Sequence, residues 1–575
     1  QARFTYSGND LTQVQNSLGR TLTFTNARGR ITQVSDGSRS VSYAYDASAN
    51  LTSFTSAVYR NTTFAYGLPG QMTSLYYPSF PTVAAATNVY DSLGRVKTQT
   101  NARGKTYEYF FAGSRTEEIG PGGTARTNYL DAQGNTIQSS TPAGNWTVST
   151  YDGQSRLIRK QLPEGNATEY AYDDASCAGA DKRCTHNVKT ITSIPKPGSG
   201  LVSLSQGFSY DSAFNQLASA TDARGKTTSY SYTAQGLPLT ITAPGDAAGV
   251  APQTSYAYSA FTPSGYPSFY LPTSKTVRTS AGNSTVTATT YNAANKYVPQ
   301  TSTVDAGVGK LNLATGFTYD AIGNMTKLDG PRSDVSDTVS FEYDGERRPF
   351  RVRDTAGQVT LTFYDDDGRP VMVARQLTLW PGSALLGAQQ LIQCTRYSET
   401  GKPVRTWGPV MAYTANTCPP ESAPALITDT AYDDLDRPFR TTQYLPTTDG
   451  GNRVTETVYN LDDSVQSVNK AVGTALAQAY VTYTYTPNGQ VNSIKDAKNN
   501  LTVHTYDGFD RLARTYYPLP ATPNYANASH SYDAAGNRIR TTWPDGFYTT
   551  TSYDAANRPS AILENGSVNL ASYAY

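Results

Sequence analysis

A short turn signature recurs from one end of this chain to the other and limits what the chain can fold into. It reads Tyr-Asp, two variable residues, Gly, and then Arg or Asn; the clearest copy is Tyr90-Asp91-Ser92-Leu93-Gly94-Arg95. Internal repetition at a fixed period determines architecture before any other property of a sequence. The related copies contain Tyr319, Asp320 and Gly323; Tyr364, Asp365 and Gly368; Tyr506 and Asp507; Tyr532, Asp533 and Gly536; and Tyr553 and Asp554.

The spacing of the signature predicts two turns in each repeat. Neighbouring copies lie 21 residues apart at 343 to 364, 485 to 506 and 532 to 553. A second turn signal follows each tyrosine by 11 or 12 residues, as in 101–105 (NARGK) and 222–226 (DARGK). Asp or Asn opens tight turns, and Gly accepts a positive φ. Two turns per period leave two short strands per period.

The segments between turns alternate large and small residues, as in Val41-Ser42-Tyr43-Ala44-Tyr45. Period-two patterning with Tyr, Thr and Val is typical of a β-strand, and stacked hairpins are expected to place tyrosine beside tyrosine on neighbouring strands. A twisted sheet of short hairpins curls as strands accumulate, and spiralling protects its edges. We therefore predict an all-β fold in which repetitive short hairpins form a spiralling sheet, as a shell or barrel that is only partly present.

Because the repeat persists from end to end, we expect one continuous β-shell segment over residues 1–575, about 27 units long, rather than several domains. Loop insertions rich in Pro, Gly and Ser are expected near 176–206, 244–272, 376–394 and 409–428.

Charged residues are 16% of the chain and the net charge is +1 without basic or acidic blocks, which argues against nucleic acid and anionic membranes as partners. No apolar run reaches the roughly 18 residues that a membrane span needs. The ends at Gln1 and Tyr575 suggest an interior piece of a longer polypeptide.

The four cysteines form two local pairs, Cys177 with Cys184 and Cys394 with Cys418, each inside an interruption of the repeat. Local pairing and an even count predict two disulfides that pin loops in an oxidising compartment. Four buried free thiols are the alternative, because sequence does not reveal their geometry.

No catalytic, cofactor or metal constellation is expected. His186 follows Cys184 closely, but the spacing matches no zinc motif, and His504 and His530 occupy repeat positions that hold Tyr or Ser elsewhere. The acidic runs at 365–367, 433–436 and 462–463 lie in the repeat turn itself, so turn formation explains them better than calcium binding. The scattered tryptophans fit loops packed onto the sheet better than a sugar-binding surface. The sequence therefore predicts a protein that is not an enzyme.

The combination of Tyr-Asp-x-x-Gly-Arg with Asn-Ala-Arg-Gly-Lys-Thr-x-x-Tyr resembles the YD-repeat, or Rhs-repeat, family over essentially the whole chain. That family includes Rhs polymorphic toxins, the cocoon component of Tc toxins, wall-associated bacterial proteins and teneurins. The resemblance implies a β-ribbon that spirals into a hollow shell. In the toxin members it implies a shell that encloses a C-terminal toxic domain.

Two functional hypotheses follow. The first is a structural shell segment of a secreted Rhs-type protein whose partner is its own C-terminal cargo domain or other chains of the same protein. The second is an extracellular structural or adhesive protein of the cell surface with glycan binding, which low charge, abundant Tyr and Thr and two disulfides would suit. Both place the chain outside the cell.

Overall fold

The computed structural model describes residues 2–16, 18–173, 184–245, 250–280, 283–292, 297–376, 389–413, 417–421, 426–518 and 525–575. These residues form one sheet of 47 strands and a single 3-10 turn, η1 (Thr447–Asp449). Every strand pairs antiparallel with the strands before and after it in sequence, from β1 through β47. The predicted all-β architecture is therefore confirmed.

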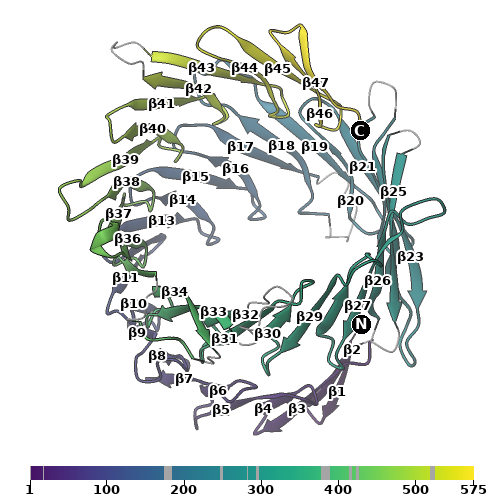
Figure 1. Ribbon diagram of the computed structural model, residues 1–575, viewed down its shortest axis with the longest axis vertical. Coiled ribbons are helices and arrows are strands. Elements are labelled where there is room, and N and C mark those ends of the chain that lie inside the picture. Colours follow the sequence, from purple (N-terminus) through teal and green to yellow (C-terminus); the bar gives the residue numbers. More distant parts are fainter. Residues whose placement is uncertain are drawn as a thin grey trace.

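The ribbon circles a common axis about twice (Figure 1). Purple and blue strands make the first circuit and green and yellow strands make the second. We call residues 2–242 the first winding and residues 253–572 the second winding.

The first winding contains β1 (Ala2–Ser7), β2 (Asp10–Asn16), β3 (Thr21–Ala27), β4 (Arg30–Ser35), β5 (Ser40–Tyr45), β6 (Leu51–Thr55), β7 (Asn61–Tyr66), β8 (Met72–Tyr76), β9 (Ala86–Tyr90), β10 (Val96–Asn101), β11 (Thr106–Ala112), β12 (Arg115–Ile119), β13 (Ala125–Leu130), β14 (Thr136–Ser140), β15 (Trp146–Tyr151), β16 (Leu157–Gln161), β17 (Ala167–Tyr172), β18 (Val188–Ile194), β19 (Leu204–Tyr210), β20 (Leu217–Thr221), β21 (Thr227–Tyr232) and β22 (Pro238–Thr242).

The second winding contains β23 (Gln253–Phe261), β24 (Phe269–Ser280), β25 (Asn283–Asn292), β26 (Val298–Val304), β27 (Leu313–Tyr319), β28 (Met325–Asp329), β29 (Thr338–Tyr343), β30 (Pro349–Arg353), β31 (Val359–Tyr364), β32 (Pro370–Gln376), β33 (Gln389–Tyr397), β34 (Pro403–Tyr413), β35 (Ile427–Tyr432), β36 (Pro438–Tyr444), β37 (Arg453–Tyr459), β38 (Val465–Lys470), β39 (Gln478–Tyr485), β40 (Val491–Asp496), β41 (Leu501–Tyr506), β42 (Leu512–Pro518), β43 (Tyr525–Tyr532), β44 (Arg538–Thr542), β45 (Tyr548–Tyr553), β46 (Pro559–Glu564) and β47 (Val568–Ser572).

Strands enter the intervals expected to be loops. The hairpin of β23 and β24 occupies much of 244–272, β18 lies within 176–206, and β33 and β34 extend into the two later intervals. The Tyr256-Ala257-Tyr258 alternation continues the strand pattern there, so the extra residues lengthen a hairpin rather than interrupt the sheet.

Each repeat tyrosine lies at a β-bulge. The register shifts between Phe363 and Tyr364, and Tyr364 then pairs with Pro370 at the start of the next strand. The same shift precedes Tyr506, Tyr532 and Tyr553. Bulges increase local twist, and proline is tolerated beside them because the ladder is interrupted there. A bulge in nearly every unit therefore gives the ribbon a repeated source of bending.

Candidate functional site: the repeat turns and the seam between windings

The tyrosine of each repeat fastens the preceding repeat. The hydroxyl of Tyr364 donates to the Pro349 carbonyl at 3.0 Å, and Pro349 is the residue opposite the previous bulge. Burial raises the pKa of Tyr364 further above neutral pH. Equivalent bonds are made by Tyr90 to Met72, Tyr506 to Val491, Tyr532 to Leu512 and Tyr553 to Arg538. Tyr319 keeps the bulge position and pairs with Met325.

The aspartate of the signature builds the turn. In Asp365, Oδ1 accepts the backbone N–H groups of Asp367 and Arg369, and Oδ2 accepts the Arg369 Nε–H at 2.7 Å. The same pattern occurs at Asp91, Asp507 and Asp554, and Asp320 and Asp533 accept an asparagine side chain instead of arginine. The Arg95 backbone N–H chiefly holds the pKa of Asp91 below its usual value, because it stabilises the charged carboxylate.

The glycine has a left-handed backbone conformation. Its φ is 78° at Gly94, 89° at Gly323, 84° at Gly368 and 88° at Gly536. Repeats that lack glycine keep this conformation, with Asp510 at 62° and Asn557 at 64°. Asp and Asn tolerate the left-handed region better than other residues with a Cβ. The degenerate copies therefore have the same turn.

The final arginine reaches forward to the next repeat. The Arg348 guanidinium lies 4.4 Å from the ring centre of Tyr364, and Arg511 lies 4.7 Å from that of Tyr532. The tyrosine faces in these repeats are therefore covered by arginine. Tyr364 and Tyr532 lie opposite Pro370 and Arg538 on the next strand, so the expectation of tyrosine beside tyrosine on neighbouring strands is wrong for them. A cation over an aromatic face contributes about 0.5–1 kcal/mol at exposed sites.

The two windings meet along a seam between unlike turns. We call the turns that lie half a repeat away from a Tyr-Asp signature back turns. Back turns of the first winding contact the Tyr-Asp turns of the second winding. Arg103 donates from Nη1 to Asp436 Oδ1 at 2.6 Å and from Nη2 to the Tyr432 carbonyl at 2.8 Å. Arg224 likewise donates to the carbonyls of Asp554 and Ala555. Both arginines occupy the same position in their back turns.

Further contacts continue the seam along the ribbon. Arg60 pairs with Asp366 at 2.9 Å, Lys105 with Asp434 at 2.6 Å, Arg126 with Asp463 at 3.0 Å and Lys196 with Asp510 at 2.6 Å. Asn166 donates to Asp510 at 2.7 Å. The acidic runs interpreted as turn formers thus have two roles: the first aspartate, such as Asp365 or Asp433, builds the turn, while Asp366, Asp434 and Asp436 reach across the seam.

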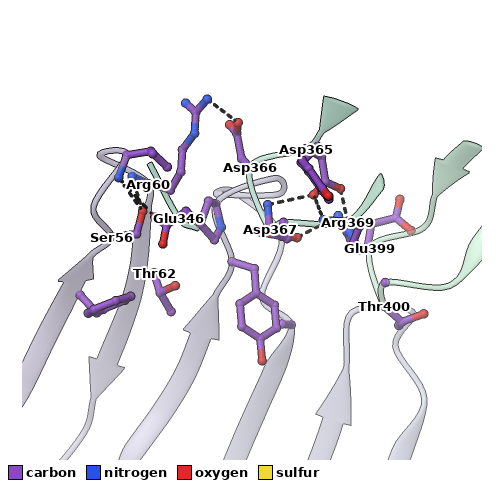
Figure 2. Close-up of a pocket in the computed structure, with 18 of the residues that line it drawn as sticks. Ser56, Arg60, Thr62, Glu346, Asp365, Asp366, Asp367, Arg369, Glu399 and Thr400 are labelled. Carbon is purple, nitrogen blue, oxygen red and sulfur yellow. Dashed lines mark hydrogen bonds and ion pairs between the residues drawn. The ribbon is translucent and has the colours of Figure 1, made fainter. Parts of the chain in front are cut away.

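A pocket of about 980 Å³ lies in this seam (Figure 2). Phe54, Val58 and Tyr77 contribute apolar walls from the first winding, and Glu346 and Asp366 come from turns of the second. Figure 2 shows Arg60 reaching Asp366 and Arg369 held between Asp365 and Asp367. These carboxylates are matched by arginines, so the pocket is a widening of the seam rather than an open cation site.

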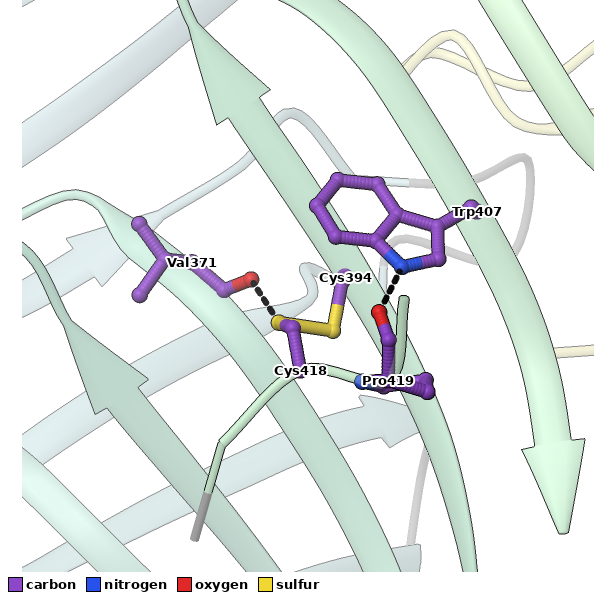
Figure 3. The surroundings of a disulfide bond; sticks show 5 residues. All are labelled: Val371, Cys394, Trp407, Cys418 and Pro419. Atoms are coloured by element: carbon purple, nitrogen blue, oxygen red, sulfur yellow. Dashed lines mark hydrogen bonds between the residues drawn. A yellow bond between two sulfur atoms is a disulfide. The ribbon is translucent and has the colours of Figure 1, made fainter. Parts of the chain in front are cut away.

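A disulfide marks the one hydrophobic core cluster in the described part of the chain. Cys394 and Cys418 are bonded, which excludes free thiols for this pair. We call residues 417–421 the strap; Cys418 in it packs against the cluster of Met372, Ile392 and Trp407. Figure 3 shows Cys418 and Pro419 of the strap beside Cys394 and Trp407. The Trp407 Nε1–H donates to the Pro419 carbonyl at 2.9 Å. Trp407 thus packs a loop onto the sheet, as expected for the tryptophans.

Charged side chains anchor the far end of the strap. Glu421 accepts from Arg396 at 2.7 Å and from Arg405 at 2.5 Å, and Arg405 also pairs with Asp429. Hydrogen bonds to Asp429 and then Glu421 raise the pKa of Arg405. In the second predicted pair, Cys184 is disulfide-bonded, and Cys177 lies outside the described residues.

Two of the three histidines, His504 and His530, belong to the sheet, and His186 lies in a turn. The Nδ1 atoms of His504 and His530 lie 3.0 Å and 3.1 Å from the hydroxyls of Thr515 and Thr541 on the paired strands. Burial lowers the pKa of both imidazoles. Within the described ranges, no group of three His, Cys, Asp or Glu side chains has a metal-binding arrangement, and no helix is long and apolar enough to span a bilayer.

Comparison with known proteins agrees with this geometry. Residues 4–199 match the Teneurin YD-shell family model, and residues 210–248 match the RHS Repeat model. These two segments are therefore similar to the YD repeats of the RHS and teneurin families. No functionally curated protein matches its sequence.

Solved structures show the same fold as this YD-repeat chain. The crystal structure of TcdB2-TccC3 aligns with a TM-score of 0.59 at 13% identity and covers 98% of this chain and 32% of that chain. Crystal structures of TcdB2-TccC3-Cdc42 and TcdB2-TccC3-TEV give TM-scores of 0.51 and 0.50 at 12% and 13% identity, with 98% and 33% covered in each. The YD-repeat chain spans about a third of the length of the structures it matches.

The tyrosine and aspartate signature was visible in the sequence, but the seam residues were missed. Their signal is an uneven distribution of acids. Several Tyr-Asp turns of the second winding contain extra carboxylates such as Glu346, Asp436 and Asp510, whereas most turns of the first winding do not.

Proposed function

We propose that this chain is a wall segment of a YD-repeat shell and that the wall encloses a polypeptide cargo carried by the same protein or by an associated chain. The observation that carries the proposal is the continuous 47-stranded ribbon that circles one axis about twice (Figure 1). A sheet without interruption excludes bulk solvent and proteases along its length, which suits enclosure better than catalysis.

The distribution of side chains supports a mechanical role. Most repeat tyrosines, with several of the arginines, hold neighbouring units together, as in the Tyr364 hydroxyl bond and the Arg348 contact with its ring, and the aspartates hold each turn. With 16% charged residues, the wall offers few strong and specific charge contacts to an unfolded chain. The fold shared with TcdB2-TccC3 supports the proposal at the level of architecture.

Protease protection tests the proposal. A protease-sensitive unfolded polypeptide is attached after Tyr575, and its digestion rate is compared with that of the same polypeptide on an unrelated β-rich carrier. We expect the polypeptide on this chain to be cleaved at least about tenfold more slowly, because cleavage then tracks the population of the open form. Equal rates on both carriers would contradict enclosure.

A secreted or cell-surface location belongs to this proposal. Disulfides form and persist in oxidising compartments, and here a disulfide joins the buried Cys394 to Cys418 of the strap. Labelling of intact cells with an antibody against the chain distinguishes surface display from retention inside the cell.

Glycan binding at a cell surface is the second candidate, and an aromatic shelf favours it. Trp543 and Phe547 lie on one turn with ring centres 5.5 Å apart, and Trp543 is 40% exposed. Exposed aromatic faces of this kind stack on sugar rings. Glycan capture by the intact chain that is lost in Trp543→Ala would support this function, and no capture by the unaltered chain would remove it.

A further inference from the structure

The Tyr-Asp turns of the two windings differ in charge. In the first winding the variable positions of these turns are occupied mainly by uncharged residues, as in 46–50 (DASAN), 91–95 (DSLGR) and 152–156 (DGQSR), and Asp174 after Asp173 is an exception. In the second winding several of these turns contain additional carboxylates, as in 344–348 (DGERR), 365–369 (DDDGR) and 433–437 (DDLDR), whereas others such as 320–324 (DAIGN) and 533–537 (DAAGN) do not. The acidic residues are therefore concentrated on the edge that faces the other winding.

The back turns show the complementary pattern. Those of the first winding supply Arg60, Arg103, Lys105, Lys196 and Arg224 to the seam. Back turns of the second winding include 354–358 (DTAGQ), 471–477 (AVGTALA) and 543–547 (WPDGF), which have no basic residue. Opposite charges thus meet at the seam. The back turns of the second winding contain isolated basic residues, such as Lys498 and Arg332, and Arg332 pairs with Asp334 in its own loop.

The seam is a different kind of contact from the sheet. Strand pairing joins only strands that are consecutive in sequence, so no β-ladder crosses the seam in the described residues. Four backbone N–H groups of the first winding are satisfied across it: Val58 by Glu346, Ser79 by Asp367, Glu164 by Asn488 and Lys196 by the Gly508 carbonyl. These amides report directly on whether the seam is closed.

We propose that the seam is an electrostatic interface that fixes the register of one winding on the other and is the joint at which the wall opens. The basic back turns of the first winding are complementary in charge to an edge of acidic Tyr-Asp turns. In this chain the second winding provides that edge. Ion pairs that are partly exposed weaken with salt, whereas the buried hydrogen bonds of a ladder are screened much less. The windings therefore separate before the hairpins unfold. This inference does not depend on whether the wall encloses a cargo.

Amide hydrogen exchange of the intact chain tests the joint. Raising NaCl from 0.05 to 1 M should speed exchange at Val58, Ser79, Glu164 and Lys196 by about tenfold, since several charge pairs are screened together. The Gly134 amide, which bonds to Asp131 within its own turn, should change less than about twofold and shows that the hairpins are intact. Equal salt responses at seam and turn amides, or none at the seam, would overturn the proposal.

Charge reversal tests the register. Lys105→Glu places like charges at the Lys105–Asp434 pair and should raise exchange at the flanking Ser79 and Glu164 amides about threefold. The swap of Lys105→Glu with Asp434→Lys should restore the original rates. Arg332→Glu is the matched control, because Arg332 pairs with Asp334 within one loop and should leave the seam amides unchanged. Failure of the swap to restore exchange would show that shape, not charge, sets the register.

Discussion

The strapped patch around Cys394 and the plain wall elsewhere stabilise the same sheet in different ways. Under the strap, Met372, Ile392 and Cys394 are 2%, 0% and 0% exposed. In the plain wall the strands are a single layer and most side chains are only half buried, as in β5 through β8. Hydrophobic burial therefore holds the patch, whereas bonds between neighbouring turns hold the rest. A wall that is one sheet thick can be stable when hydrogen bonds and arginine–tyrosine contacts join neighbouring units.

The largest expected effect is the loss of a buried side chain in the patch. Ile392→Ala should lower the local free energy of opening by about 3–4 kcal/mol, since a fully buried aliphatic is replaced by a cavity. Ile494→Ala in the plain wall, where Ile494 is half buried, should cost about 1 kcal/mol because less apolar area is involved. Hydrogen exchange of β33 and β40 measures both. Equal costs would erase the distinction between the two regions.

Opening the disulfide should affect the patch nearly as strongly. Replacing Cys394 and Cys418 together by Ala removes a cross-link with a sequence separation of 24, which should cost about 3 kcal/mol through greater freedom of the unfolded segment. Faster proteolysis confined to β32 through β34 is the expected result, measured by mass spectrometry of the fragments. Destabilisation of distant hairpins such as β5–β6 would contradict a local role for the strap.

A smaller effect is expected from one clamp in the plain wall. Tyr506→Phe removes the 2.7 Å hydroxyl bond to the Val491 carbonyl and should cost about 1 kcal/mol. Because the acceptor belongs to the preceding repeat, exchange should increase in β40 as well as β41. Tyr6→Phe is the control, since Tyr6 is 58% exposed. A change in β41 alone would show that the clamp does not couple repeats.

The smallest effect concerns a turn without glycine. Ala49 has φ 74°, so Ala49→Gly should stabilise its hairpin by about 0.5–1 kcal/mol by relieving left-handed strain. The reverse change, Gly536→Ala, should destabilise by a similar amount, because Gly536 has φ 88° and open space around its Cα. Thermal unfolding of the two variants measures both signs, and the same sign in both would refute the assignment.

The repeat allowed much of the fold to be predicted, because Tyr-Asp-x-x-Gly-Arg encodes a turn whose contacts are local. The Asp365 bonds within four residues need no tertiary information. The partners of Arg103 and Arg224 did need it, since they lie about 330 residues away and depend on the circumference that accumulates over many bulges. The strap could not be predicted for the same reason. The spacing of Cys394 and Cys418 predicts a disulfide, but it does not reveal the hydrophobic cluster against which the disulfide packs.

The hydroxyl of each tyrosine reaches backward, which gives the wall a direction of growth. The Pro349 carbonyl accepts from Tyr364, and the Val491 carbonyl accepts from Tyr506. Each of these hydrogen bonds can form only after the later tyrosine has been synthesised, so a hairpin acquires its last bond from the hairpin that follows it. During synthesis on the ribosome, the folded part of the wall would therefore end one hairpin before the newest strand.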